Sequence, residues 1–587
     1  MSPHRRNIAL FVLLLVCLRG ALVLSLADVF GYGEEFAKSG AAKAMLDGLG
    51  LPHHQINYAY HEGGGFAVSH LEALGFLVLG PCVLVVKLVA IGFAIATLLA
   101  GAWMLAEHVS TRSAYIFAAL FAFAPETFQR VSLLSLGTHV EASLFILLVF
   151  HFTARTVRGG GASKHAPFWM GICGGLGCYV GLQMPPVLFV CGIAILATIR
   201  GKVLVGVVGR SLAGFAIGAL PLWWMMSHVG FGGVLIYRDT QKGPGFFESL
   251  PVVFTSILQS RDPLTWMQTV AFVVVIAWGL VIRRAHLQWI LLGYLLVFMI
   301  GWGMSGLAKP YDAAWAGAWF EMLRLVPPWL VVTALAAIGI DTLWSQGGSK
   351  RVVALVTTLI AISAGIRGTI ALASGGRPGA PIENASILLS ARGYSYQEYF
   401  VQLEYHFEGS RARKAAVLLR SRDDPALLVP DVANVLYGQP GYKPAPDTTP
   451  RSIENILPEL AEVFGAHRDL ALLGVGATVN GFWNYDVAAA FAKLETLPLD
   501  VREPLAEGLG RNGIGSRFWA EKLPLLFAVV PPERWHDAWW RGVGWRVHRT
   551  FRLRPDLARE TLATLTERDR APAIVGYERA VGLDRIR

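Results

Sequence analysis

Charged side chains are scarce in this chain of 587 residues: Asp, Glu, Lys and Arg make up 16%, whereas hydrophobic residues make up 54%. This balance excludes an ordinary soluble enzyme and indicates a polytopic membrane protein. The net charge of +10 does not indicate nucleic-acid binding. Much of the excess lies in short segments between apolar runs, where basic residues set the orientation in the membrane. We therefore expect no nucleic acid among the partners.

Cysteine is also rare, and its placement excludes two kinds of site. No Cys-x-x-Cys pair occurs, and the C-terminal third contains no cysteine, so neither a cysteine zinc site nor a disulfide framework is indicated. All five cysteines lie in apolar stretches, and we interpret them as buried structural thiols. They are Cys17, Cys82, Cys173, Cys178 and Cys191.

Long apolar runs are what the sequence does contain. About eleven of them approach the roughly 17–25 residues that cross a bilayer, although 113–125 and 186–199 are short. We expect an all-α polytopic membrane protein with about eleven transmembrane helices, joined to a soluble α-helical domain. The runs cover residues 8–28, 83–106, 113–125, 138–154, 167–183, 186–199, 211–227, 266–282, 286–306, 325–344 and 352–374.

Basic residues between these runs predict an orientation. Arg5 and Arg6 precede the first run and place the N-terminus in the cytoplasm. Alternation then places segment 28–74, and everything after about residue 375, outside the membrane. We expect an integral protein of the inner or plasma membrane with an extracytoplasmic C-terminal domain. The clusters that fall on the cytoplasmic side are Arg112; Arg155, Arg158 and Lys164; Arg200, Lys202 and Arg210; Arg283 and Arg284; and Lys350 and Arg351.

The sequence predicts a domain boundary near residue 375, where the Gly/Pro-rich stretch GGRPGAP follows the last apolar run. We assign 1–374 to the transmembrane domain, 375–400 to a linker and the start of the soluble region, and 401–587 to a helical-repeat domain. The repeat is inferred from glycines at intervals of 34 residues, the length of a tetratricopeptide unit, although the consensus residues of that family are missing. We predict helical hairpins of similar length, with a protein as their possible partner. The glycines are Gly474, Gly508, Gly542 and Gly576.

The first candidates for chemistry are the adjacent acids Glu34 and Glu35, in the external loop 28–74. A carboxylate at the membrane boundary can deprotonate an acceptor hydroxyl or hold a divalent metal ion. The alternative is that the two acids only favour the start of the helix expected over 36–49.

A second group in the same loop is Tyr60, His61 and Glu62, followed by three glycines. Glycines let a backbone approach a ligand closely, and their amides can face a phosphate. We assign Tyr60, His61 and Glu62 to substrate binding.

Later polar residues lie at the outer ends of apolar runs. His139 and Glu141 open the fourth run, Arg238 and Lys242 lie in the loop 228–265, and Arg324 precedes the tenth run. A guanidinium in such a place can bind a phosphate through two parallel hydrogen bonds. We assign all five to substrate binding.

Two cations, Arg19 and Lys87, lie inside apolar runs. A cation at that depth usually faces a cavity or pairs with an acid, or it reaches the membrane surface along its own stem. These two residues therefore predict either hidden polar partners or side chains that extend to the membrane surface.

Several of these segments together resemble the GT-C superfamily of membrane glycosyltransferases, such as protein O-mannosyltransferases and the aminoarabinose transferases of lipid A. The segments are GYGEEFAKSGAAKAMLDG followed by INYAYHEGG, then GTHVEASLF, GLQMPPVLF and MLRLVPPWLVVTALAAIGI. Glu34 falls where that family has its catalytic aspartate, and Glu141 matches its second acidic motif. The chain departs from the pattern in having Glu for Asp at position 34 and Leu325 where Tyr is usual.

The resemblance implies a donor sugar linked to a polyprenyl phosphate in the membrane and an acceptor glycan, lipid or protein outside. It implies an inverting displacement in which Glu34 takes the proton of the acceptor, while Arg324, with Arg238 or Lys242, neutralises the departing phosphate. His139 and Glu141 would hold the acceptor or a metal. If a metal is used, Mg²⁺ or Mn²⁺ is implied, with Glu34 and Glu141 as candidate ligands.

Two other functions stay open from the residues alone. A transporter or flippase of a lipid-linked intermediate predicts charges deep in several spans and inverted repeats between the halves. A non-catalytic scaffold that recruits partners through its helical repeats needs no acids in the first loop.

Overall fold

The computed structural model describes residues 3–26, 33–48, 63–181, 183–229, 263–283, 285–304, 326–374, 429–437, 453–477, 487–512, 523–551 and 554–586, with six isolated positions between 385 and 419. Its secondary structure is entirely helical over these residues, which confirms the predicted all-α class. The chain forms two compact units. One comprises residues 1–38 with 57–393, and the other comprises 39–56 with 394–587.

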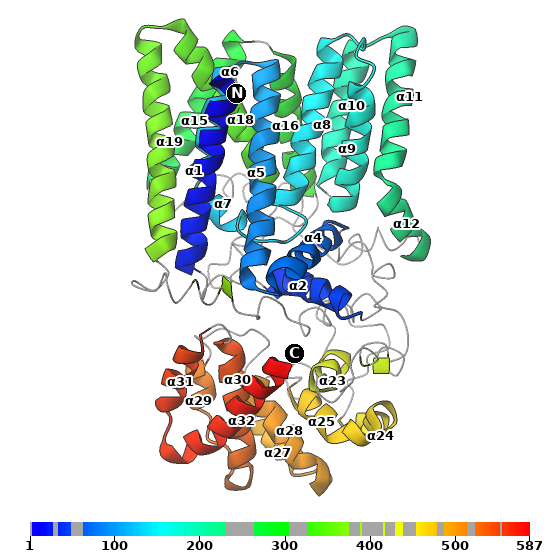
Figure 1. Cartoon of the computed structure of the whole chain (residues 1–587), viewed down its shortest axis with the longest axis vertical. Helices are drawn as coiled ribbons and strands as arrows, with labels where there is room; N and C mark the ends of the chain where they lie inside the picture. The colour runs from blue at the N-terminus through cyan, green and yellow to red at the C-terminus, as the bar shows by residue number, and fades with distance from the viewer. Residues whose placement is uncertain are drawn as a thin grey trace. The chain divides into compact units, whose positions relative to one another are not determined.

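The first unit is a bundle of long helices that lie side by side (Figure 1). Six described helices are long and apolar enough to cross a bilayer, and five more apolar helices are shorter. Their length and composition identify an integral membrane protein. The helices are α1 (Pro3–Leu26), α4 (Gly63–Leu79), α5 (Val83–His108), α6 (Thr111–Ala122), α7 (Glu126–Val131), α8 (Val140–Arg158), α9 (Ala166–Val180), α10 (Met184–Thr198), α11 (Gly201–Gly218), α12 (Leu220–Val229), α15 (Pro263–Ile282), α16 (His286–Met304), α18 (Val326–Gln346) and α19 (Ser349–Ser374). The unit also contains residues 33–38 of α2 (Gly33–Leu46).

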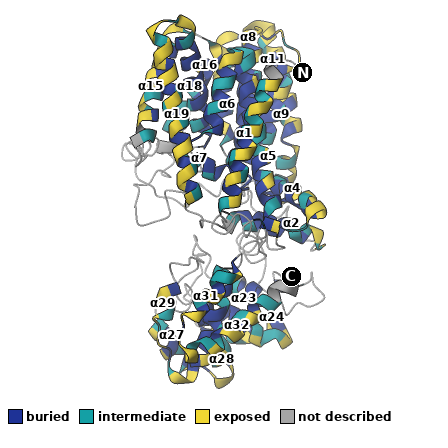
Figure 2. Ribbon diagram, turned by 60° about the vertical axis from the view of Figure 1, so that its left-hand side comes forward, coloured by how far each residue is buried: buried dark blue, intermediate teal, exposed yellow. Residues whose placement is uncertain are grey.

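Large apolar side chains are exposed on the outward faces of this bundle (Figure 2). Examples are Val78 on α4, Val205 on α11 and Val281 on α15, each more than 70% exposed. A soluble protein rarely exposes so much apolar surface, whereas the hydrocarbon of a bilayer covers it without cost.

Each predicted apolar run contains a helix, but some boundaries differ from those expected. Helix α6 has 12 residues and is shorter than a membrane span, because Pro125 disfavours helical geometry in the residue before it. The run predicted over 211–227 is wrong at its start, since α11 begins at Gly201. The predicted loop 28–74 contains two helices, α2 and the start of α4.

Helices α9 and α11 pack backbone against backbone at glycines. A Cβ on Gly171 would lie 2.0 Å from the carbonyl oxygen of Ser211, and one on Gly218 would lie 2.2 Å from that of Ile172. Small residues that allow such close approach are typical of helix pairs in membranes. Van der Waals contact between the two backbones therefore stabilises the packing of α9 against α11.

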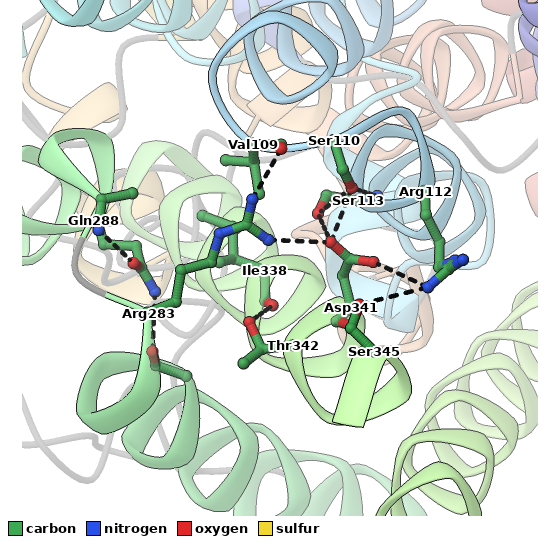
Figure 3. Close-up of polar contacts among 12 residues, drawn as sticks. Val109, Ser110, Arg112, Ser113, Arg283, Gln288, Ile338, Asp341, Thr342 and Ser345 are labelled. Carbon is green, nitrogen blue, oxygen red and sulfur yellow. Dashed lines mark hydrogen bonds and ion pairs between the residues drawn. The ribbon is translucent and has the colours of Figure 1, made fainter. Parts of the chain in front are cut away.

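At the end of the bundle that carries the N-terminus, Asp341 on α18 joins three segments (Figure 3). Its carboxylate is 3% exposed and accepts hydrogen bonds from the hydroxyls of Ser110 and Ser113, at 2.7 and 3.0 Å. It also pairs with Arg283, at 3.2 Å, and with Arg112, at 3.5 Å. The basic residues of this end therefore fasten the α5–α6 and α15–α16 turns to α18.

The second unit contains helices that cross in succession at the regularly spaced glycines. A Cβ on Gly508 would lie 2.3 Å from the carbonyl oxygen of Leu473, and one on Gly542 would lie 2.0 Å from that of Glu507. Gly576 meets Arg541 in the same way. The glycines thus bring neighbouring backbones together, while the assignment to helical-hairpin repeats stays a prediction. The helices are α23 (Val429–Tyr437), α24 (Ile453–Phe464), α25 (Arg468–Gly476), α27 (Val487–Leu494), α28 (Leu499–Asn512), α29 (Leu523–Phe527), α30 (His536–Thr550), α31 (Pro555–Ala563) and α32 (Glu567–Ile586).

We predict that Asp341→Asn lowers the free energy of unfolding by about 1–3 kcal/mol, because the substitution weakens charge-assisted bonds to a buried acceptor. Thermal unfolding of the purified protein in detergent measures this loss. Arg112→Gln is the matched control, since the Arg112 side chain is 51% exposed and should contribute little. Equal unfolding temperatures for Asp341→Asn and the native protein would contradict the role given to Asp341.

We also predict that Gly542→Ala destabilises the second unit by about 1–3 kcal/mol, because its Cβ would overlap a main-chain carbonyl that cannot move freely. Gly582→Ala is the control, since a Cβ there meets nothing within 4 Å and alanine favours the helix. Limited proteolysis of the full chain should then show earlier cleavage of the second unit for Gly542→Ala alone. Similar cleavage of both variants would show that this crossing tolerates a side chain.

Candidate functional site

Helices α2 and α4 meet the start of α5 at one end of the bundle (Figure 1). A buried ion pair joins α2 to α5 there. Lys87 on α5 donates to both carboxylate oxygens of Glu35 on α2, at 2.8 and 2.6 Å, and both side chains are no more than 2% exposed. The amide of Ser135 donates to the same carboxylate at 3.1 Å. The pair therefore fixes α2 against two other parts of the bundle.

Helix α2 forms because its sequence favours it locally. It is rich in alanine, and Glu34 and Glu35 lie in its first turn, where the helix dipole stabilises carboxylates. Glu35 faces inward to Lys87, whereas Glu34 is half-buried. The hypothesis that these acids favour the start of a helix agrees with this geometry, and the buried pair gives Glu35 a positioning role.

Two further carboxylates lie beside this pair. Glu72 on α4 is 0% exposed and Glu141 on α8 is 1% exposed. The charges of Glu35, Lys87 and Glu141 all act on Glu72. No side-chain oxygen of Glu72 or Glu141 has a hydrogen-bond partner within the described part of the chain.

The immediate surroundings of these two acids are polar but do not satisfy them. The hydroxyl of Ser135 lies close to Glu72 without hydrogen-bonding geometry. The main-chain amides of Leu136, Gly137, His139 and Glu141 itself lie close to the carboxylate of Glu141, also without that geometry. Both carboxylates therefore have polar neighbours and keep the capacity to accept from a further group.

The charges in this group do not balance. Glu35, Glu72 and Glu141 contribute −3 when ionised and Lys87 contributes +1, so the four side chains would together carry −2. Buried carboxylates without a counter-charge are strongly disfavoured. Bound protons or a bound cation can neutralise the excess, and so can the ammonium of Lys38, which is also buried on α2 and lies beside Gly65 of α4.

The three glycines that open α4 create the close packing of this site. A Cβ on Gly63 would lie 2.1 Å from the ring of Tyr179, and one on Gly64 would lie 1.7 Å from the carbonyl oxygen of Gly137. Gly137 itself has φ +85°, a conformation that favours glycine. The glycines thus allow close contact with Tyr179 and Gly137 of the protein itself, whereas the sequence had indicated close contact with a ligand.

A second buried cation, Arg19 on α1, stabilises the break between α6 and α7. Its guanidinium is 0% exposed and donates to Ser132, Gln129 and the carbonyl oxygen of Ala122, at 2.8, 3.2 and 3.4 Å. No acid faces it within the described residues. The carbonyl of Ala122 ends α6, so the negative end of that helix supplies part of the missing counter-charge.

The predicted site residues have different outcomes. The structure brings Glu35 and Glu141 into one buried group around Glu72. The ring nitrogen Nδ1 of His139 lies 3.2 Å from the side-chain nitrogen Nε2 of Gln183. The remaining predicted substrate residues lie outside the described part of the chain. They are Tyr60, His61, Glu62, Arg238, Lys242 and Arg324.

Sequence reasoning missed Glu72 and Ser135. Glu72 carried a usable signal, because a lone acid in the apolar stretch SHLEALGFLVL is costly unless it is functional or paired. Ser135 carried none, since a serine in a short connection has no distinctive pattern.

Comparisons with known proteins give few matches. No protein-family description matches the sequence, and no curated protein matches it. Among solved structures, the archaeal oligosaccharyltransferase AglB from Archaeoglobus fulgidus, in complex with an inhibitory peptide and a dolichol-phosphate, is similar with a TM-score of 0.41 and 14% identity. The match covers 79% of this chain and 64% of that one, less than two thirds of its length. A likeness of this size assigns neither a family nor an activity.

We predict that Glu35→Gln and Lys87→Met each destabilise the bundle by about 3–5 kcal/mol, because either change leaves a buried charge without its partner. The double variant should lose less than the sum of the two losses. Thermal unfolding in detergent measures all three, and Asp500→Asn, at an exposed ion pair of the second unit, should leave the unfolding temperature unchanged. Additive losses in the double variant would show that the two side chains act independently.

Proposed function

We propose that this protein is a membrane glycosyltransferase that moves a sugar from a polyprenyl-phosphate-linked donor to an acceptor. The observation that carries the proposal is the buried group of Glu35, Glu72, Glu141 and Lys87, with two unsatisfied carboxylates at one end of an apolar bundle. Such a group is costly in a membrane protein unless it serves a function. Glu35 and Glu141 of this group come from segments that resemble the GT-C superfamily in sequence.

In the proposed reaction, a hydroxyl of the acceptor attacks the anomeric carbon of the donor sugar. A new bond forms between the hydroxyl oxygen and that carbon, and the bond from the carbon to the phosphate oxygen breaks. The proton of the hydroxyl passes to the carboxylate of Glu34, which is less buried than Glu35 and can meet a substrate. The electron pair of the broken bond leaves with the polyprenyl phosphate.

Within this proposal, Glu35 is a positioning residue. Its pair with Lys87 holds the first turn of α2, and Glu34 belongs to the same turn. The ion pair therefore orients the base without contacting the substrate. Arg324, with Arg238 or Lys242, remains the proposed partner of the departing phosphate.

The unsatisfied carboxylates of Glu72 and Glu141 fit a hard divalent cation, because Mg²⁺ and Mn²⁺ prefer oxygen ligands. The fit rests on four carboxylate oxygens without partners and on a formal charge of −2. A metal held there would supply positive charge to stabilise negative charge that develops on the phosphate.

The proposal includes an orientation. We infer that the end of the bundle with the Asp341 network faces the cytoplasm, since Arg112 and Arg283 lie there. The opposite end, with Glu35 and Glu72, then faces outward, where the acceptor is found.

The test is turnover of polyprenyl-phosphate-linked sugars by the purified protein in lipid nanodiscs. We expect the native protein to consume a donor and Glu34→Gln to be slower by a factor of about 10²–10⁴, the usual contribution of a general base. Glu462→Gln, at an exposed position of the second unit, should keep the native rate. Glu72→Gln should raise the Mn²⁺ concentration needed for half-maximal turnover.

Two results would overturn the proposal. One is a Glu34→Gln protein that transfers sugar at the native rate. The other is the absence of turnover by folded native protein across several donors, with Mg²⁺ and with Mn²⁺, which would favour a scaffold.

A further inference from the structure

A second polar group lies at the other end of α5. Glu107 and His108 occupy the last turn of α5, and His151 lies on α8. Each side chain offers one ligand atom, and these atoms lie within 4.8 Å of one another. Lys87 and Glu107 are twenty positions apart on one helix, about 30 Å at the rise of an α-helix, so this group is separate from the candidate site above.

Among the three residues, His151 has the buried ring nitrogens that are available to a ligand. Its ring is 0% exposed, and neither ring nitrogen has a hydrogen-bond partner among the described residues. The ring packs against Trp103, with 4.0 Å between centroids, and lies 5.0 Å from the ring of His108. Because an unsatisfied buried imidazole is costly, packing alone does not account for a histidine here.

The orientation of His108 favours a metal ligand. Its Nε2 lies 3.0 Å from the carbonyl oxygen of His151, and a carbonyl only accepts, so Nε2 carries the proton. A neutral ring then has its lone pair on Nδ1. Histidines that bind metals commonly donate their other ring N–H to a carbonyl in this way, which fixes the tautomer.

Glu107 is the third member of the group, and its Oε2 is the carboxylate oxygen that faces His151. Arg155 pairs with Oε1 at 3.4 Å, and Oε2 lies 3.7 Å from Nε2 of His151. Both Glu107 and His108 also lie at the C-terminal end of α5, where the helix dipole favours a cation. Arg158 donates to the main-chain oxygen of Glu107 at 2.8 Å, so its guanidinium has a partner other than the Glu107 carboxylate.

We propose that Glu107, His108 and His151 bind one divalent transition-metal ion of the zinc class, which cross-links α5 to α8. Two imidazoles and one carboxylate suit Zn²⁺ and Co²⁺, whereas Mg²⁺ and Ca²⁺ prefer oxygen ligands. The bound ion would join the ends of two packed helices, and a water molecule would complete its four-coordinate shell.

The test uses Co²⁺ as a spectroscopic probe on the purified full-length protein in nanodiscs. We expect one Co²⁺ per chain with visible absorption bands of a four-coordinate site, displaced by Zn²⁺. His108→Gln and His151→Gln should each weaken binding at least tenfold, while His165→Gln, at an exposed histidine, should not. Glu72→Gln should also leave these bands unchanged, which separates this site from the candidate active site.

A second readout protects the test against variants that do not fold. Zn²⁺ should raise the unfolding temperature of the native protein and of His165→Gln, but not that of His108→Gln. Absence of the visible bands in the native protein, or bands that persist in both His108→Gln and His151→Gln, would overturn the proposal.

Discussion

The burial of charge in an apolar bundle is the constraint on which the rest of this structure depends. Lys87 lies on a helix of spanning length, and its ammonium is 2% exposed. Without a counter-charge, a helix carrying this lysine would be strongly disfavoured in the membrane. Glu35 supplies that charge, and because Glu35 belongs to α2, the ion pair determines where the first turn of α2 lies.

The same constraint gives different results in other parts of the bundle. Asp341 is satisfied by two hydroxyls and two arginines, so it holds segments together and has no capacity left for a ligand. Glu72 and Glu141 are equally buried but unsatisfied. Buried charge that is fully paired thus maintains the fold, and buried charge that is incompletely paired marks a candidate site.

Much of the fold was predictable from the sequence, because apolar runs of spanning length have few alternatives to helix. The sequence also indicated an acidic partner as one of the alternatives for Lys87. It did not decide between Glu34 and Glu35, since adjacent acids point in different directions and the direction depends on where α2 begins.

Other features were beyond sequence reasoning for physical reasons. The contacts of Asp341 with Ser110 and Ser113 join residues more than 200 positions apart, and no local pattern reports such pairing. Glu72 was passed over because it was assigned to the external loop 28–74, ahead of the apolar run over 83–106. The structure places it on a separate helix, α4, which begins at Gly63, since the glycines permit contact that bulkier residues would block.

The measurement that tests this account most directly is a cryo-EM map of the native protein in nanodiscs with Mn²⁺. The account predicts density for a bound cation between the carboxylates of Glu72 and Glu141, with Lys87 still paired to Glu35. A map in which Glu72 and Glu141 are each hydrogen-bonded to groups of the protein, with no additional density between them, would contradict it.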